Sequence, residues 1–215
     1  MTYLEYKHKI EFSEEQIKEL FEFGKLIGID LFASVWDKDS VDVMAKYTKI
    51  AKLGSASIND LELCKYAREN FDFLIISTGM STEEEIEECV EVCNPDVIMH
   101  TNSTYPCPEE ELNLRYIEWL KQKYPNKEIG YSGHEYRLQT TTATVALGAT
   151  WIERHITLDR VMYGSDQAAS LELSGMKDLT ESMNKIILSL GEPSLGKIID
   201  DELPIAKKLR AHIKV

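Results

Sequence analysis

The sequence has too few basic residues for a protein whose main partner is nucleic acid or an anionic membrane. Its 24 lysines and arginines are outnumbered by 37 aspartates and glutamates, which gives a net charge of −13 at pH 7. Nucleic acids and anionic lipid surfaces attract proteins of the opposite charge, so this balance argues against both. A small anionic ligand is compatible with it, because such a ligand needs only a local cluster of donors.

The sequence also lacks long hydrophobic runs and paired cysteines. No stretch approaches the roughly 18 apolar residues of a membrane helix. The first ten residues, MTYLEYKHKI, contain no apolar core of a secretory signal. Of the four cysteines, Cys64, Cys89 and Cys93 fall on apolar positions of predicted helices, and Cys107 lies in a predicted loop between two prolines. We therefore expect a cytoplasmic protein with reduced thiols.

No glycine-rich phosphate loop of the GxGxxG or GxxxxGKS type follows a predicted strand. What the sequence does contain is a regular alternation of short apolar runs and longer amphipathic segments. The apolar runs predict strands over 29–36, 48–55, 73–78, 96–102, 128–133 and 150–157. The amphipathic segments predict helices over 13–26, 39–46, 59–69, 82–93, 108–123, 138–147 and 174–190.

The apolar runs are continuous rather than alternating, which indicates strands buried on both faces of a parallel sheet. Such an alternation of strand and helix leaves two architectures, the doubly wound open sheet and the (β/α)₈ barrel. Polar residues gather at the C-terminal end of nearly every predicted strand, where a barrel builds its active site, and this favours the barrel. We therefore predict an α/β fold of the (β/α)₈ TIM-barrel type, incomplete, with about six βα units. The charges of EYKHKIEF argue against a further irregular strand through Leu4, Tyr6 and Ile10.

Two histidines stand at equivalent places in consecutive units. His134 follows the strand that contains IGYSG, and His155 follows WIER in the next strand. Neutral imidazoles on adjacent strand ends can come within about 4–5 Å of each other and share a divalent ion. The alternative is that each is a hydrogen-bonded histidine of the barrel wall.

Lys52 is an isolated base in an apolar strand, and a buried lysine needs a partner. That partner is either a phosphate or carboxylate group, a Schiff-base carbonyl, or a structural Asp or Glu. Hydroxyls at other strand ends would surround the same anion; these belong to Ser55, Ser77, Ser103 and Ser132. Tyr105 and Asp166 lie in loops that follow strands, where they would either contact a polyhydroxylated substrate or stabilise the loops.

Several long motifs resemble the catalytic domain of the sialic acid synthase family, which makes N-acetylneuraminate, legionaminate and pseudaminate. The likeness extends from about residue 10 to residue 210, and its motifs are ISTGMSTEEEIEECVE, HTNSTYPCPEEELNLRYI, GYSGHEY, VALGATWIERHITLDR and GSDQAASLE. The resemblance implies condensation of phosphoenolpyruvate with an open-chain N-acetylated hexosamine such as N-acetylmannosamine. In that reaction the enol carbon attacks the aldehyde, water adds at C2, and phosphate leaves with C–O cleavage. A divalent ion, Mn²⁺ or Mg²⁺, activates the aldehyde.

The resemblance also assigns roles to residues. His134 and His155 match the two metal ligands, and Tyr105 and Asp166 match contacts to the sugar. The family positions around phosphoenolpyruvate are matched in this sequence by Lys52, Ser55, Ser77, Ser103 and Ser132. Ser34 matches a threonine position near them. We therefore expect His155, Lys52 and Tyr105 to be catalytic. We expect substrate binding by Ser34, Ser55, Ser77, Asn102, Ser103, Ser132 and Asp166.

The sequence departs from the family pattern in four ways. The two earlier strands that carry a catalytic glutamate and a phosphate-binding lysine are missing, so we expect a single barrel-type domain over 1–215, truncated at its N-terminus. A C-terminal antifreeze-like domain is missing as well. Ser57 and Gly133 stand where family members commonly have acidic residues. We expect a homodimer or a separate N-terminal segment to cover the resulting gap.

Two other functions remain open. The first is an inactive remnant or partner subunit that binds anionic sugars. The second is another metal-dependent barrel enzyme of the aldol type that uses pyruvate as its donor.

Overall fold

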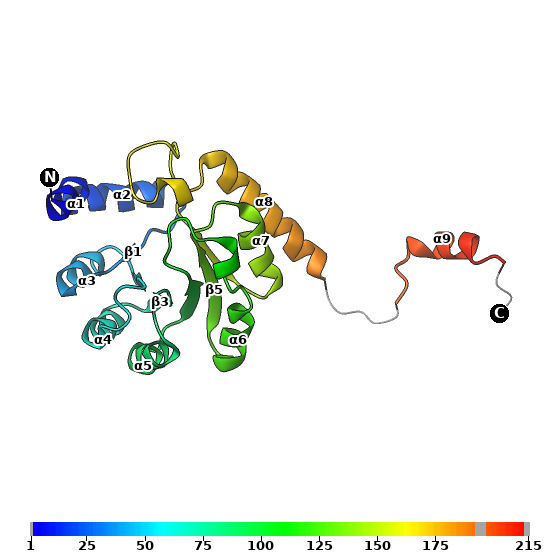
Figure 1. The fold of residues 1–215 in the computed structure, drawn as a ribbon, viewed down its shortest axis with the longest axis horizontal. Coiled ribbons are helices and arrows are strands. Elements are labelled where there is room, and N and C mark those ends of the chain that lie inside the picture. The colour runs from blue at the N-terminus through cyan, green and yellow to red at the C-terminus, as the bar shows by residue number, and fades with distance from the viewer. Residues whose placement is uncertain (1, 192–196, 213–215) are drawn as a thin grey trace.

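The computed structural model describes residues 2–191 and 197–212, and its six strands form one parallel sheet. The strands follow one another in space in the order β1-β2-β3-β4-β5-β6. A doubly wound sheet reverses its order at a switch point, whereas a barrel does not. The sequential order therefore confirms the prediction of an incomplete barrel. Helices α3 to α8 lie in an arc on the outer side of the curled sheet (Figure 1).

Each strand is short, and most are followed by one helix. The strands are β1 (Ala33–Ser34), β2 (Ile50–Leu53), β3 (Phe73–Ser77), β4 (Val97–Thr101), β5 (Glu128–Gly133) and β6 (Trp151–Arg154). The helices after them are α3 (Lys38–Met44), α4 (Leu61–Asn70), α5 (Glu83–Cys93), α6 (Tyr116–Lys123), α7 (Leu138–Ala146) and α8 (Leu173–Leu190). The others are α1 (Tyr3–Ile10), α2 (Glu14–Ile27), α9 (Glu202–Leu209), and the 3₁₀ turns η1 (Glu109–Glu111) and η2 (Gln167–Ala169).

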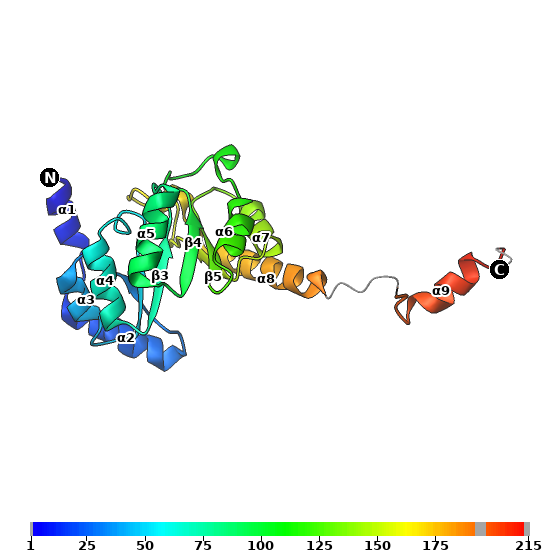
Figure 2. The same ribbon diagram turned by 90° about the horizontal axis from the view of Figure 1, so that it is seen from below.

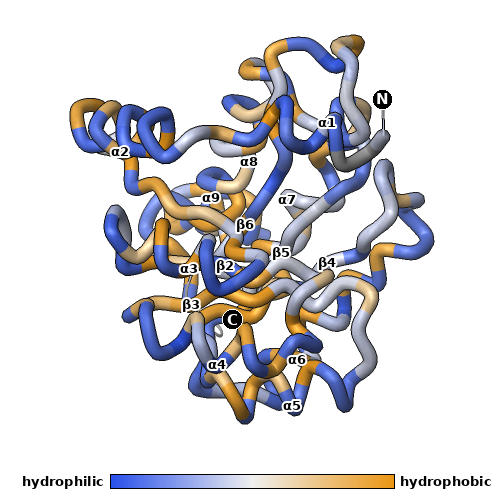
Figure 3. The backbone as a smooth tube through the Cα atoms, turned by 90° about the vertical axis from the view of Figure 1, so that its left-hand side faces the viewer, coloured by the Kyte–Doolittle hydropathy of each residue, from blue (hydrophilic) through white to orange (hydrophobic). Residues whose placement is uncertain are grey.

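The central strands β3, β4 and β5 are buried on both faces, which explains their continuous apolar runs, whereas β1, β2 and β6 are half-buried on the inner face. Side chains alternate between the two faces along each strand. Residues such as Leu74 and Ile98 belong to the large cluster between sheet and helices. Ile75 and Met99 belong to a second cluster inside the curl. Gly130 leaves room for the Met99 side chain on the inner face, because a Cβ at position 130 would lie 2.2 Å from the Met99 sulfur. Hydrophobic colour accordingly concentrates on the central strands (Figure 3).

Helix α5 begins and ends as its sequence predicts. The Thr82 hydroxyl accepts the Glu85 N–H, and the Glu85 carboxylate accepts the Thr82 N–H, which forms a complete capping box. Asn94 ends the helix in the left-handed region, with φ of 43°. Between α4 and α5, the Cys89 sulfur lies 3.7 Å from the sulfur of Cys64 and 3.7 Å from that of Cys93. All three cysteines are free and buried, as is Cys107.

Three predictions of local structure were wrong or incomplete. The segment through Tyr6 and Ile10 is neither strand nor loop but helix α1, whose capping box between Thr2 and Glu5 went unrecognised. The predicted helix 108–123 is divided into η1 and α6, because Asn113 takes φ of 43° between them. Helix α9 was not predicted. It lies apart from the sheet, beyond the end of α8 (Figure 2).

The sheet has an open side between its edge strands β1 and β6. Helix α1 lies against the loop that follows β6, where the rings of Tyr6 and Tyr163 meet edge to face at 6.0 Å. Among the described residues, no helix combines the length and apolar character that crossing a membrane requires.

A buried histidine on β4 makes the stability of this fold dependent on pH. His100 is 5% exposed, and its Nε2 lies 2.7 Å from the Leu112 carbonyl oxygen. Burial lowers the pKa of His100 below the ordinary value of 6.5, although the bond to Leu112 opposes the shift. As pH falls below that value, the unfolded chain takes up this proton more readily than the folded protein, so acid favours unfolding.

We expect His100→Phe to remove this pH dependence. The variant loses one hydrogen bond, which costs about 0.5–1.5 kcal/mol near neutral pH. Between about pH 7 and pH 5, however, its free energy of unfolding should fall less steeply than that of the wild type. Urea denaturation across this range measures both slopes. Replacing the exposed His8 by Gln is the control and should leave the wild-type slope unchanged.

Candidate active site

The inner face of the sheet becomes polar at the C-terminal ends of its strands. Lys52 of β2 and Glu153 of β6 both point into the curl, where the Lys52 Nζ lies 2.8 Å from the Glu153 Oε1. The Ser132 hydroxyl of β5 donates to the same oxygen at 2.7 Å. Ser34 of β1 pairs directly with Lys52 in the sheet register. Lys52 therefore has the acidic partner that its burial requires.

Glu153 is a site residue that sequence reasoning missed. Burial alone would raise the pKa of its carboxyl, but the Lys52 charge and the hydrogen bonds from Lys52 and Ser132 outweigh burial and lower the pKa. The carboxylate is thus ionised at neutral pH. In the sequence WIER, Glu153 is only one of two adjacent charged residues at the end of a predicted strand. Its period-two spacing from Trp151, which lies inside the curl, was the available signal.

Three polar groups converge beside Lys52 in a hydroxyl cradle formed by Ser55, Gly79 and Ser103. The Gly79 N–H donates to the Ser55 hydroxyl at 3.0 Å. A Cβ on Gly79 would lie 2.3 Å from the Ser103 Oγ and 2.8 Å from the Ser55 Oγ, so a side chain here would displace these hydroxyls. Gly79 was not predicted as a site residue.

Hydroxyls in this region are buried without partners. Within the described part of the chain, the Ser77 and Ser103 Oγ atoms are shielded from solvent and make no hydrogen bond. An unpaired buried hydroxyl is costly, and such groups call for a functional or ligand-based explanation. Asn102 has a partly different arrangement, because its Nδ2 donates to the Glu111 carbonyl while its Oδ1 stays unpaired. Open donors beside a lysine suit an anion.

The two predicted histidines lie side by side. The ring centroids of His134 and His155 are 5.1 Å apart. The His134 Nδ1 lies 2.6 Å from the Asn102 carbonyl oxygen, so an Nδ1–H tautomer donates there and leaves Nε2 free as a ligand. Burial lowers the pKa of His134, with a smaller contribution from His155, and keeps the imidazole neutral. The His155 Nδ1 is 3.9 Å from the Asp166 carboxylate.

These residues fit part of a metal site. No group of three or more His, Cys, Asp or Glu side chains in residues 2–191 or 197–212 is arranged to hold a metal ion. The two imidazoles can supply two nitrogen ligands, and an open site leaves other positions to water and substrate. The chemistry of the donors thus suits a divalent ion bound at a site with exchangeable positions.

Tyr105 covers the histidine pair. Its ring centroid lies 4.1 Å from that of His134 and 5.8 Å from that of His155. Burial, with the negative charges of Asp166 and Glu153, raises the pKa of the Tyr105 hydroxyl, which therefore stays a donor. A cavity beside His155 is walled by the loop that carries Asp166 and by residues of α1, including Tyr6 and Ile10. The structure thus brings most of the predicted site residues into three groups: Lys52 and Ser132 meet at Glu153, Ser55 and Ser103 flank Gly79, and Tyr105, His134, His155 and Asp166 lie beside one another.

The sequence model of the NeuB family matches residues 1–194. The chain belongs to the NeuB family. It is 36% identical over 213 residues to the N-acetylneuraminate-9-phosphate synthase of Mus musculus, which covers 97% of this chain and 59% of that protein. It is 33% identical over 197 residues to the N,N'-diacetyllegionaminic acid synthase of Campylobacter jejuni, with coverage of 88% and 59%.

A solved structure agrees with this assignment. The N-acetylneuraminic acid synthetase of Leptospira borgpetersenii, determined in complex with citrate, superposes with a TM-score of 0.85 at 29% identity. The match covers 94% of this NeuB-family chain and 72% of that one. Against the two curated relatives above, the chain spans 59% of their length. The family and the barrel-type fold are therefore confirmed.

Removing the Glu153 charge should destabilise the fold. In Glu153→Gln, Lys52, whose side chain is only 12% exposed, loses its carboxylate. We expect the free energy of unfolding at pH 7 to fall by about 1.5–3 kcal/mol, the usual contribution of hydrogen bonds to charged groups. Urea denaturation measures the change.

The matched control is Glu14→Gln. Glu14 pairs with Lys46 at the same distance of 2.8 Å, but both side chains are exposed. Solvent screening makes such a pair weak, so the control should change stability much less. Equal losses in the two variants would contradict the role assigned to Glu153.

Proposed function

We propose that this chain supplies the catalytic barrel of a nonulosonate synthase. The reaction joins phosphoenolpyruvate to the open-chain aldehyde of an N-acetylated hexosamine of the N-acetylmannosamine type and releases phosphate. One observation carries this proposal: a lysine with open hydroxyls and a pair of adjacent histidines, 5.1 Å apart between ring centroids, share one end of the sheet. The names of the relatives, synthases of sialic and legionaminic acids, support the same class of product.

The anionic donor would bind on the lysine side. Lys52 and the hydroxyl cradle supply the positive charge and donors that a phosphate or carboxylate needs. The unpaired Ser77 and Ser103 hydroxyls would gain partners at that moment. In the structure the Lys52 ammonium group donates a hydrogen bond to the Glu153 carboxylate, so a bound anion would compete with Glu153 for this donor.

The aldehyde would bind on the histidine side. His134 and His155 would hold a divalent ion, Mn²⁺ or Mg²⁺, which when bound polarises the aldehyde oxygen as a Lewis acid. Tyr105 keeps a hydroxyl proton to donate to the sugar, and Asp166 accepts from its hydroxyls. In the overall change the enol carbon forms a bond to the aldehyde carbon, and the aldehyde oxygen gains a proton. Water adds at C2, and the C–O bond to phosphate breaks.

We propose that a second copy of the chain, or a separate N-terminal segment, covers the open side between β1 and β6. Exposed parallel strand edges invite pairing, which supports the proposal. If a second copy covers the open side, light scattering coupled to gel filtration should show a particle larger than the 24.6 kDa of one chain. If a separate segment covers it, the particle should become larger when that segment is added. A stable, well-folded monomer that shows no change on adding such a segment would contradict it.

The direct test of function is phosphate release with phosphoenolpyruvate, Mn²⁺ and a panel of N-acetylated hexosamines. Release should require one of the sugars. His155→Ala should reduce the rate by more than the about 10–100-fold that follows loss of an outer-shell partner, because it removes a ligand itself. A folded, metal-binding protein that releases no phosphate would instead support a sugar-binding remnant or partner subunit.

Gly79→Ala tests the anion site by itself. The new methyl group would lie 2.3 Å from the Ser103 hydroxyl and force the cradle apart. We expect the affinity for phosphoenolpyruvate, measured calorimetrically, to fall about tenfold, which corresponds to about 1.4 kcal/mol. Gly54→Ala is the control in the neighbouring loop, because its Cβ would meet only Trp36, at 3.9 Å. Equal effects of the two substitutions would place the anion elsewhere.

A further inference from the structure

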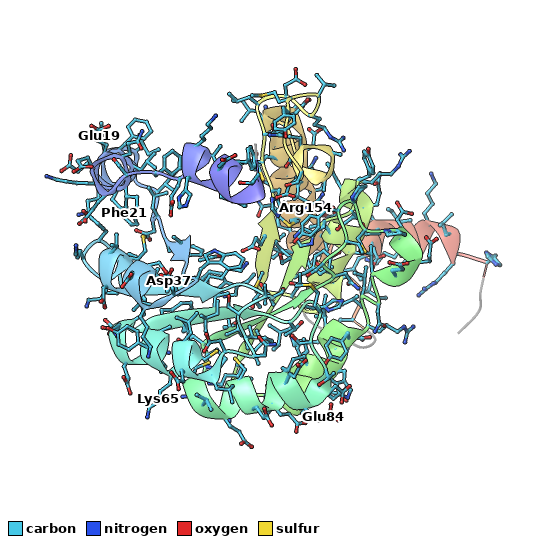
Figure 4. All side chains as sticks on the ribbon, turned by 60° about the vertical axis from the view of Figure 1, so that its left-hand side comes forward. Glu19, Phe21, Asp37, Lys65, Glu84 and Arg154 are labelled. Carbon is cyan, nitrogen blue, oxygen red and sulfur yellow. The ribbon has the colours of Figure 1, made fainter. Side chains whose placement is uncertain are left out.

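A buried ion pair lies directly behind the two histidines. The side chains of Arg154 and Glu135 have no exposed area, and the Arg154 Nη1 lies 3.6 Å from the Glu135 Oε1. Arg154 occupies the last position of β6, where alternation turns it away from the inward-facing Glu153. Figure 4 labels Arg154, which lies where β6 meets the loop leading to α8. Each member of the pair is the chain neighbour of one histidine.

The Arg154 guanidinium joins three segments of the site. Its Nη2 donates to the backbone oxygen of Glu135, at 2.5 Å, and to that of Ala169, at 3.3 Å. Its Nη1 donates to the Thr141 hydroxyl at 2.7 Å and to the Arg137 carbonyl at 3.3 Å. These contacts fix the loop after His134, the start of α7, and the η2 turn that follows Asp166. A planar group with five donors can do this, and a lysine cannot.

The Glu135 carboxylate is held as tightly as its partner. Hydroxyls donate to it from Tyr131 at 2.9 Å, from Thr140 at 3.0 Å and from Thr141 at 2.5 Å. Gly133 makes the room, because a Cβ there would lie 2.6 Å from the Glu135 Oε2. In the sequence SGHE, the glycine at 133 therefore leaves the space that the Glu135 carboxylate occupies.

The His155 ring is held by packing rather than by hydrogen bonds, with centroid distances of 5.8 Å to Tyr105 and 5.1 Å to His134. Among the described residues no hydrogen bond reaches its ring, and Asp166 lies 3.9 Å away. Its backbone carbonyl accepts the Leu171 N–H at 2.7 Å, which ties it to the strand end. The backbone from which this ring projects follows directly on Arg154, whose side chain is anchored to the neighbouring segments. A buried ion pair is poor evidence for stability, since apolar replacements are often as stable, and this points to positioning.

We propose that Arg154 and Glu135 are positioning residues that hold His134, His155 and Asp166 in the geometry that binds the divalent ion. The inference rests on the proposed metal site. It adds that metal affinity is controlled by a charge pair that touches neither metal nor substrate.

The test compares two double variants in the full chain. Glu135→Leu/Arg154→Met removes the pair without leaving a lone buried charge. Arg68→Met/Asp96→Leu is the matched control; it removes a partly buried pair, 2.8 Å apart, near the opposite ends of the strands. Mn²⁺ affinity is measured by electron paramagnetic resonance, with thermal unfolding followed in parallel. We expect about 10–100-fold weaker Mn²⁺ binding for the site variant and no more than about twofold for the control.

The outcomes separate the two proposals. Wild-type affinity in a folded site variant would overturn the positioning role while leaving the metal site intact. Failure of the wild type to bind Mn²⁺ would overturn the metal site and, with it, this inference. If the double variant does not fold, Mn²⁺ binding is measured for Arg154→Lys instead. This variant keeps the positive charge but lacks the planar guanidinium group with its several donors. Weakened Mn²⁺ binding in that variant supports the proposal, and unchanged binding refutes it.

Discussion

The structure depends on a parallel sheet whose central strands are buried on both faces. With helices on one side and the curl on the other, each step along a strand moves the next side chain to the opposite face. On β6 this places Glu153 against Lys52 inside the curl and Arg154 against Glu135 outside it. Two charged neighbours in the sequence thus serve two separate networks. His155, the next residue, lies between these networks at the strand end.

Much of the fold follows from local sequence. The apolar runs placed all six strands, and the amphipathic segment 82–93 placed α5. The errors arose where a local signal was overridden or overlooked. Asn113 in the left-handed region divided an otherwise helical segment. At the N-terminus, the charges that exclude a barrel strand are compatible with helix α1, whose capping box is present in the sequence.

The sequence predicted which residues lie at the site, from their positions at strand ends, but not which side chains contact one another there. Polar residues at strand ends identified Lys52 and both histidines because a barrel gathers those ends together. Glu153 and Gly79 were missed since their roles lie in contacts between distant segments. The Lys52–Glu153 hydrogen bond spans 101 residues of sequence. The importance of Gly79 appears only when the Ser55 and Ser103 hydroxyls are seen to occupy the space of a side chain.

The length of β1 has a further consequence for association. This edge strand consists of only Ala33 and Ser34, so it offers few backbone groups for unspecific pairing with other chains. Short edges are one way in which proteins avoid aggregation. A partner that joins the sheet here must therefore be selected by its side chains, such as those that could meet the exposed Phe32 and Trp36. Contacts to these two exposed rings, rather than strand pairing, would then decide which segment can cover this edge.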